Sequence, residues 1–299
     1  MKTNLHDEMQ IRQHAYFSKA TLVSALCNIS YLIFSYFMLT KYYASIYKEE
    51  MTYNQVIQNI FNPFTLALAI WLNVFYITIY YLEHPFFEQF KVNKIDWPWK
   101  ENPKHFKRIL PGAIKAYLIN SVSFFFYMLA LGIFAQPALS LNKLPSFGKY
   151  VYQIFMCILL EDFFFYWGHR LLHHPLLYAR VHKKHHEFYN TIHISCIDTH
   201  WFEFLASNII PLFSSIFVLK GQIHMVTFMS FFWIRVSNTH GGHSGYDFPW
   251  VGGKEIPGTM DSAYHSFHHL KNVGNYASFF RFWDTLFGTN KYYLDSLEE

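Results

Sequence analysis

The sequence has 299 residues, of which 52% are hydrophobic, 21% aromatic and only 15% charged. Soluble proteins are roughly one quarter charged, so this composition excludes a disordered chain and favours burial in a membrane. The net charge of +4, counted with neutral histidines, gives no sign of a nucleic-acid-binding surface. The three cysteines form no C-x-x-C pair, which excludes a disulfide framework and a cysteine-ligated iron–sulfur cluster. The 18 histidines remain as the candidates for chemistry.

Uncharged runs of about 20 residues, the length needed to cross a bilayer core of about 30 Å, recur along the first half of the chain. We predict three spanning helices at 21–40, 64–82 and 116–142, the last ending or bending at Pro137. A fourth is predicted at 150–167. It contains Glu161 and Asp162, which need partners or an interior face.

Two later apolar runs, 204–219 and 221–234, are each too short to cross comfortably. We expect them to form a hairpin that dips into one leaflet, with a fifth and sixth span as the alternative. The loop at 91–108 carries six basic residues against two acids, so the positive-inside rule places it in the cytosol. The amino terminus, which lacks a signal-peptide cleavage site, and the chain after the fourth span are then cytosolic as well.

Fourteen of the 18 histidines lie between positions 169 and 269. His169 and His173 are four residues apart, which on a helix places both rings on one face and lets them hold one metal. Two H-x-x-H-H trios have similar helical spacing, and each is expected to project from one helical face. The trios are His182, His185 and His186, and His265, His268 and His269.

So many imidazoles would repel one another if protonated, and if neutral and buried each would need a partner. Metal ions meet both requirements by taking a nitrogen lone pair from each ring. A closed structural zinc site uses four ligands, so eight or more clustered histidines imply at least two ions. Imidazole binds zinc, copper, iron and nickel, so the spacing alone does not identify the metal.

Other histidines have competing interpretations. His174 could replace His173 as a ligand if the helix loosens at Pro175. His200 and His243 are isolated in sequence, which favours a core or capping role for each. His240 precedes His243 by three residues, but the two glycines between them favour a turn.

Six short motifs occur in a fixed order. They are YWGHRLLHH at 166–174, HKKHHE at 182–187, TH at 199–200 followed by Glu203, HSGYDFPW at 243–250, HSFHH at 265–269 and FWDTLFGT at 282–289. This set resembles the fatty acid hydroxylase superfamily of membrane di-iron enzymes, also called the sterol desaturase superfamily. Within it the HSGYDFPW stretch favours the C-4 methylsterol monooxygenases.

The resemblance implies that the pair His169 and His173, both trios and His243 ligate two iron ions. It implies O2 as co-substrate and electrons from NAD(P)H, delivered by cytochrome b5 and its reductase. The chain has no glycine-rich nucleotide-binding motif, which agrees with an external reductant. The implied reaction oxidises a C-4 methyl group of a sterol, with one oxygen atom leaving as water, at the cytosolic face of the endoplasmic reticulum membrane.

The predicted fold is therefore all-α: an integral-membrane helical bundle of four spans plus a shallow helical hairpin, with a cytosolic histidine-rich cap. We divide the chain into an N-terminal transmembrane region at 1–149, a fatty acid hydroxylase-like di-iron domain at 150–294 and a tail at 295–299.

Two departures from the family pattern leave alternatives open. Ser266 stands where the last motif usually has aspartate, and Trp201 stands where proline is common. The alternatives are a related sterol desaturase or dealkylase, a fatty acyl or sphingolipid hydroxylase, and a non-catalytic zinc-binding membrane protein. A transporter would need charged or broken helices at mid-membrane, and the early runs show none.

Overall fold

The computed structural model describes residues 19–49, 51–60, 83–248 and 258–298, and every regular element within these ranges is helical. The predicted all-α class is confirmed. The amino-terminal segment and the predicted span at 64–82 lie outside the described residues, so the number of spans remains a prediction.

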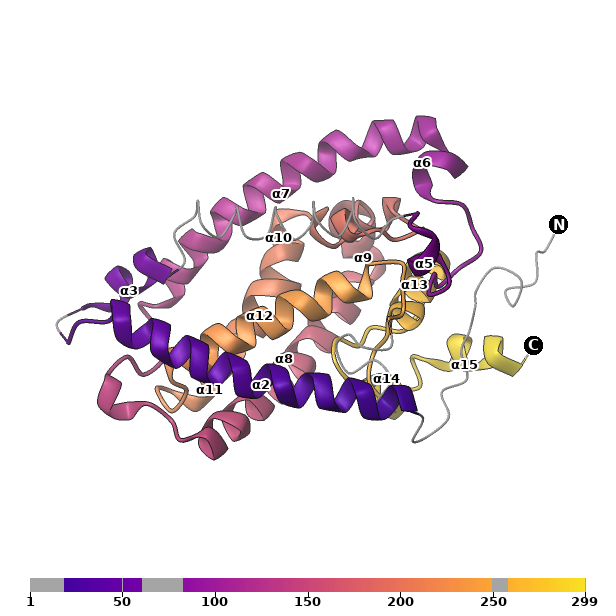
Figure 1. The fold of residues 1–299 in the computed structure, drawn as a ribbon. Helices are drawn as coiled ribbons and strands as arrows, with labels where there is room; N and C mark the ends of the chain where they lie inside the picture. The colour runs from indigo at the N-terminus through magenta and orange to yellow at the C-terminus, as the bar shows by residue number, and fades with distance from the viewer. Residues whose placement is uncertain (1–18, 50, 61–82, 249–257, 299) are drawn as a thin grey trace.

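Four long helices run along the molecule, joined by a fifth helical rod of three consecutive segments (Figure 1). The long helices are α2 (Lys19–Ile46), α7 (Pro103–Leu131), α8 (Phe147–Leu172) and α12 (Met225–Gly242). The rod consists of α10 (Trp201–Glu203), the π-helical η5 (Phe204–Ile209) and α11 (Ile210–Leu219). Helix α11 packs mainly on α8, and α12 packs on α2 and α8.

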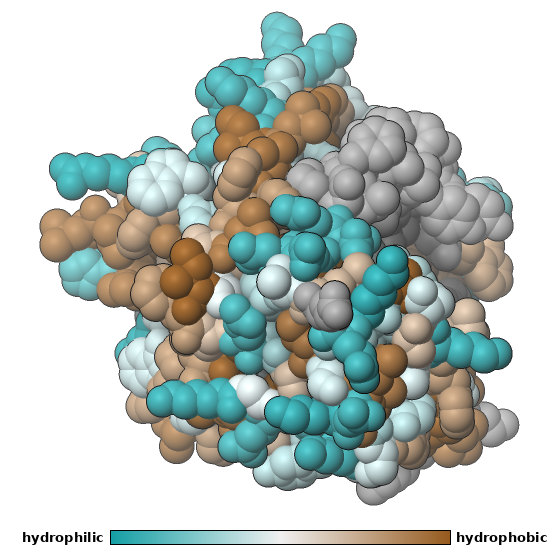
Figure 2. Space-filling model, turned by 90° about the vertical axis from the view of Figure 1, so that its left-hand side faces the viewer, coloured by the Kyte–Doolittle hydropathy of each residue, from teal (hydrophilic) through white to brown (hydrophobic). Residues whose placement is uncertain are grey.

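Short helices cover the two ends of this bundle. One end carries α5 (Pro85–Glu88), α6 (Pro98–Glu101), α9 (Pro175–Leu177), η2 (Tyr178–His182), η3 (His185–Glu187), η4 (His193–Ile197), α13 (Ser262–Lys271), α14 (Phe282–Phe287) and α15 (Lys291–Glu298). The other end carries α3 (Tyr53–Ile60) and η1 (Leu141–Lys143). Figure 2 faces this second end, where hydrophilic side chains lie among hydrophobic ones.

Three helices in the described part of the chain are long and apolar enough to cross a membrane: α7, α8 and the rod Trp201–Leu219. The prediction that the run at 204–219 is too short was wrong. The helix begins at Trp201, so the rod has 19 residues, close to the roughly 20 needed.

The predicted bounds of the third span were also wrong. Helix α7 begins at Pro103, whose fixed φ suits a first helical position, and the Asn102 side chain caps it by accepting from the backbone of His105. The helix ends at Leu131, before Pro137. Part of the predicted basic loop, from Lys104 onward, therefore lies on the first turns of α7.

The exposed faces of two candidate spans are continuous apolar stripes with a four-residue repeat, the spacing of one helix face. They comprise Ile114, Leu118, Val122 and Phe126 on α7, and Phe155, Leu159, Phe163, Trp167 and Leu171 on α8. Apolar patches of this kind are rare on soluble monomers, and they fit contact with lipid. The aromatic run at 163–167 is divided between surface and core: Phe163 and Trp167 are exposed, whereas Tyr166 is fully buried.

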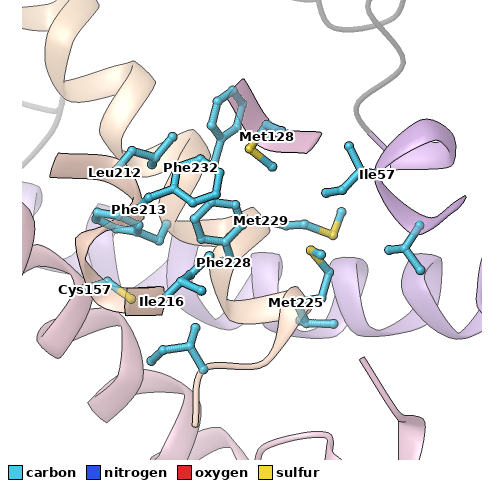
Figure 3. Packing of buried hydrophobic residues seen from close by; sticks show 14 of the residues in the cluster. Ile57, Met128, Cys157, Leu212, Phe213, Ile216, Met225, Phe228, Met229 and Phe232 are labelled. Atoms are coloured by element: carbon cyan, nitrogen blue, oxygen red, sulfur yellow. The ribbon is translucent and has the colours of Figure 1, made fainter. Parts of the chain in front are cut away.

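The main core fills the space between the long helices with large apolar side chains (Figure 3). Phe213 of α11 and Phe228 of α12 are fully buried, with ring centroids 5.4 Å apart. Ile57 of α3 and Met128 of α7 belong to the same cluster. The core thus fixes the helices along the bundle, and two smaller apolar clusters pack the histidine-bearing end.

Gly168 on α8 marks a close approach between backbones. A Cβ atom there would lie 2.8 Å from the carbonyl oxygen of Ala206 in η5, whereas one on Gly112 of α7 would meet nothing within 4 Å. We expect Gly168→Ala to destabilise the protein by about 1–3 kcal/mol, because two helices must separate. Gly112→Ala, the matched control, should change stability by no more than about 1 kcal/mol. Thermal unfolding in detergent micelles measures both; equal melting temperatures would contradict the proposed contact.

Candidate metal centre

Nine predicted histidines converge in two neighbouring clusters. One consists of His169, His173, His182, His186 and His268, and the other of His185, His243, His265 and His269. Within each cluster the candidate ligand atoms all lie within 4.8 Å of one another. Every ring is buried except that of His173, which is partly buried. The clusters are in contact, since the rings of His186 and His269 have centroids 4.6 Å apart.

Each H-x-x-H-H trio is divided between the clusters, so the expectation that a trio serves one helical face was wrong. On α13, His268 joins the first cluster and His269 the second. Successive helical residues point about 100° apart, so adjacent histidines face different centres. The other trio lies on no single helix. His182 ends the π-helical η2, and His185 and His186 begin the 3-10 turn η3.

The Nε2 atoms of these rings approach one another closely. The distance is 3.1 Å between His173 and His268 and between His182 and His186. In the second cluster, Nε2 of His243 lies 2.9 Å from that of His265 and 3.2 Å from that of His185. Two nitrogens that bind one ion at about 2.1 Å lie roughly 3.0–3.4 Å apart, so this spacing fits shared metal ions.

Backbone carbonyls on the far side of the rings fix how the imidazoles are protonated. Nδ1 of His169 lies 3.1 Å from the carbonyl oxygen of Tyr276, and Nδ1 of His243 lies 2.8 Å from that of Thr239. The rings of His268 and His269 make the same contact with Gly274 and Phe188. Because a carbonyl only accepts, the proton must be on Nδ1. Nε2 therefore presents a lone pair to the centre of its cluster, as a metal ligand must.

A buried carboxylate orients one further ring. Oε1 of Glu203, on α10, lies 2.8 Å from Nδ1 of His182, and both side chains are 2% exposed. A carboxylate on the outer nitrogen of a histidine is a common support of metal-bound imidazole. Glu203 therefore lies against the outer nitrogen of a ring in the first cluster, at ion-pair distance.

Burial keeps the rings neutral. Desolvation, and next the charge of neighbouring imidazoles, holds the pKa of His185, His186 and His265 well below the usual 6.5. Burial also lowers the pKa of His243 to about 3. At pH 7 the rings are therefore uncharged and able to bind metal without first losing a proton.

Three acids hold the loop that supplies two of the carbonyls, and two of them, Glu161 and Asp162, attach it to α8. Asp162 accepts hydrogen bonds from the backbone of Phe279 at 2.7 Å and Phe280 at 3.0 Å. Asp284 accepts from the backbone of Tyr276 at 2.9 Å and Ala277 at 2.8 Å. Glu161, fully buried, accepts from Arg235 of α12 and from Ser278. The expectation that the two acids of α8 need partners is confirmed.

The remaining candidates lie outside both clusters. His174 and His200 cap short helices by accepting from the backbone of Leu176 and Phe202, respectively. His240 is buried in α12 with its ring 6.1 Å from that of His193.

The two family departures leave the clusters intact. The Ser266 hydroxyl lies 3.0 Å from the Thr191 hydroxyl, and neither residue is a member of a cluster. Trp201 occupies the first position of α10, where the capping ring of His200 starts the helix without proline.

Two cavities adjoin the centre. The smaller has a volume of about 40 Å³. It is lined by rings of both clusters, including His169, His182, His185, His243 and His265. The larger offers about 100 Å³ and lies among α7, α11 and α12, with a mainly apolar lining. Four residues line both: Cys196, Asn208, Arg235 and Thr239. The apolar cavity therefore adjoins the space beside the histidines.

The region that contains the two clusters is similar to a known protein family. Residues 154–289, which contain both clusters, match the model of the fatty acid hydroxylase family. The part of the chain that carries both clusters is therefore similar to the fatty acid hydroxylase family. No solved structure matches the chain significantly.

Several curated proteins are similar to part of the chain. The chain is 38% identical over 153 residues to a very-long-chain aldehyde decarbonylase of Oryza sativa and 35% identical over 153 residues to methylsterol monooxygenase 1-1 of Arabidopsis thaliana. It is 31% identical over 153 residues to the C-4 methylsterol oxidase of Schizosaccharomyces pombe. Each alignment covers 50% of this chain and 50% of the relative, so the similarity spans about half of each protein.

Sequence reasoning missed two kinds of residue. The supporting carbonyls of Gly274, Tyr276, Phe188 and Thr239 carry no side-chain signal, so no sequence pattern could have found them. Arg235 could have been found, because a lone arginine within an apolar helix is expensive and marks a buried partner or a site.

The two clusters predict two metal ions per chain with unequal tolerance to ligand loss. His269→Ala leaves three histidines in the second cluster, whereas His173→Ala leaves four in the first. We expect His269→Ala to lower the metal content of the purified protein to about one ion per chain, and His173→Ala to lower it less. Elemental analysis measures the content. His200→Ala, outside both clusters, is the control and should keep two ions; equal losses in all three variants would contradict the assignment.

A substitution at Asp284 tests whether the loop that supplies carbonyls to His169 and His268 stabilises metal binding in the first cluster. Asp284→Ala frees the backbone that holds the carbonyls on His169 and His268, and loss of such outer support typically costs 10–100-fold in metal affinity. We expect one of the two ions to be removed at about tenfold lower chelator concentration. Asp295→Ala on α15 is the control. Unchanged chelator resistance in a folded Asp284→Ala protein would show that the loop does not support the cluster.

Proposed function

We propose that this chain catalyses the O2-dependent oxidation of a sterol, most directly hydroxylation of a C-4 methyl group, at two iron ions bound by the two histidine clusters. The observation that supports this most is the convergence of nine histidines in two clusters, four of them with Nδ1 on a backbone carbonyl and Nε2 turned inward, beside a cavity that adjoins an apolar one. The similarity to methylsterol monooxygenases supports the choice of substrate.

The residues fit a pair of ions rather than one closed structural site. All of the ligands are nitrogens, five in one cluster and four in the other, and the smaller cavity adjoins both. Bound iron supplies the redox chemistry of dioxygen, which protein side chains lack. The balanced reaction consumes one O2, two electrons and two protons; a C–H bond becomes C–OH, and the second oxygen atom leaves as water.

The chain's own residues supply binding, orientation and exclusion of water. The rings and their carbonyl partners hold the ions, and the apolar side chains Phe124, Leu212 and Phe232 line the larger cavity. Because this cavity lies among the candidate spans, a lipid substrate reaches it from the bilayer. Its apolar lining also keeps bulk water from the reacting carbon.

The electrons come from outside the chain in this proposal. Cytochrome b5 and its NAD(P)H-dependent reductase are the proposed donors, in the endoplasmic reticulum membrane with the centre on the cytosolic side. Lys100 of α6 and Lys104, Lys107 and Arg108 of α7 lie at the histidine-bearing end of the bundle. Basic groups there would speed encounter with an acidic haem protein.

The decisive experiment measures product. Iron-loaded protein in nanodiscs is supplied with cytochrome b5, its reductase, NADH and a 4-methylsterol. Oxygen uptake that matches formation of 4-hydroxymethylsterol supports the proposal. Turnover on a fatty acyl chain, ceramide or very-long-chain aldehyde, with none on sterols, would replace it. Zinc without iron in the native protein, and no oxygen uptake, would identify a non-catalytic zinc protein.

The apolar cavity can be tested by filling it. Ser121 of α7 lines the cavity, and its neighbour Val122 faces outward on the lipid-exposed stripe. We expect Ser121→Phe to raise the KM for the sterol about tenfold or more while the metal content stays at two ions, because the added ring occupies substrate space. Val122→Phe, the matched control, places the same ring outside the cavity and should leave KM unchanged. Equal KM values in both variants would place the substrate elsewhere.

A further inference from the structure

Arg235 is a buried cation at the boundary between the two cavities. It lies on α12, is 5% exposed and lines both the apolar cavity and the one beside the histidines. An arginine among apolar helices is costly unless its donors are used. A role for Arg235 must therefore account both for its position between the cavities and for its hydrogen bonds.

The known partners use only part of the guanidinium. Its Nε donates to Glu161, and its Nη2 donates to the carbonyl of Ser207 at 3.3 Å. The Phe165 ring, whose centroid lies 5.0 Å from Cζ, holds the group against α8. A guanidinium has five N–H donors, and no described residue accepts from Nη1. Donor capacity therefore remains on a rigid group that borders both cavities.

The other three residues that line both cavities are poorer donors. The Asn208 amide donates to the Ser207 hydroxyl, and the Thr239 hydroxyl donates to the carbonyl of Arg235. The Cys196 thiol is a weak donor. A substrate oxygen at this boundary would thus meet Arg235 as its strongest donor.

We propose that Arg235 recognises the substrate by donating a hydrogen bond to an oxygen substituent near the carbon that is oxidised. This inference rests on the proposed function. A sterol carries its hydroxyl on C-3, one carbon away from C-4. When a C-4 methyl group reaches the histidine-lined cavity, the hydroxyl lies only three bonds from the reacting carbon, at the boundary, and the ring system fills the apolar side.

A purely structural role would be to neutralise Glu161. Lysine could serve that role, since it keeps the charge, but it lacks the planar fork that donates in several fixed directions. Arg235→Lys therefore separates the two roles. Arg170→Lys is the matched control, because Arg170 lies on α8 outside both cavities and donates to the Tyr166 hydroxyl.

The test measures binding without turnover. A 4-methylsterol and its 3-deoxy analogue are titrated, without oxygen or reductant, into iron-loaded protein in nanodiscs. We expect the wild type and Arg170→Lys to prefer the hydroxylated sterol about tenfold or more, as a hydrogen bond from a charged donor predicts. In Arg235→Lys the preference should fall below about threefold, with affinity for the deoxy sterol unchanged. Melting temperature and iron content confirm that each variant is folded.

The outcomes separate this inference from the proposed function. If the wild type binds both sterols equally, or a folded Arg235→Lys keeps the preference, Arg235 is not the recognition residue and sterol binding still stands. If neither sterol binds, the proposed substrate and this inference both fail. Should Arg235→Lys not fold, the double variant Glu161→Gln with Arg235→Gln removes both charges together, and the same loss of preference is expected of it.

Discussion

The structure depends on one electrostatic constraint: lone pairs of buried imidazoles face one another at about hydrogen-bond distance. Nε2 of His243 approaches two other ring nitrogens, while its own proton is committed to the Thr239 carbonyl. Neutral rings in this arrangement repel through their lone pairs, and protonated rings would repel more strongly. A cation shared by each cluster removes the conflict. The centre is therefore best understood as preorganised for metal.

Buried acids connect the bundle to the cap and hold the backbone that positions the rings. Asp162 of α8 holds the backbone at Phe279 and Phe280, and Asp284 holds the segment whose carbonyls reach His169 and His268. Each carboxylate satisfies two backbone N–H groups, which offsets the cost of burying the acid. The cap also has a small apolar cluster that includes Ala277 and Phe267, so polar contacts to α8 and apolar packing together fix the ligand geometry.

The sequence indicated which histidines form the centre, but it did not indicate how they divide between the two clusters. Histidine spacing indicated eight of the nine convergent rings, because i, i+3 and i+4 positions share a helical surface, whereas His243 was indicated only by the family resemblance. It could not predict that His268 and His269 face different clusters, since that depends on where α13 lies between two centres. The start of α7 at Pro103 and the rod at Trp201 were missed because charged or aromatic residues interrupt the apolar runs without interrupting the helices.

The boundary between the cavities bears on which substrates the centre can accept. Two of the relatives are named for a methylsterol and for a very-long-chain aldehyde, and both names denote molecules that carry an oxygen atom. A donor such as Arg235, placed between an apolar cavity and the histidines, suits both kinds of molecule. Discrimination between a rigid ring system and a linear chain must then come from the shape of the apolar cavity, because dispersion and exclusion of water act along its whole lining. In the proposed reaction, the hydrogen bond from Arg235 determines which carbon reaches the histidines, and packing in the apolar cavity determines which lipid binds.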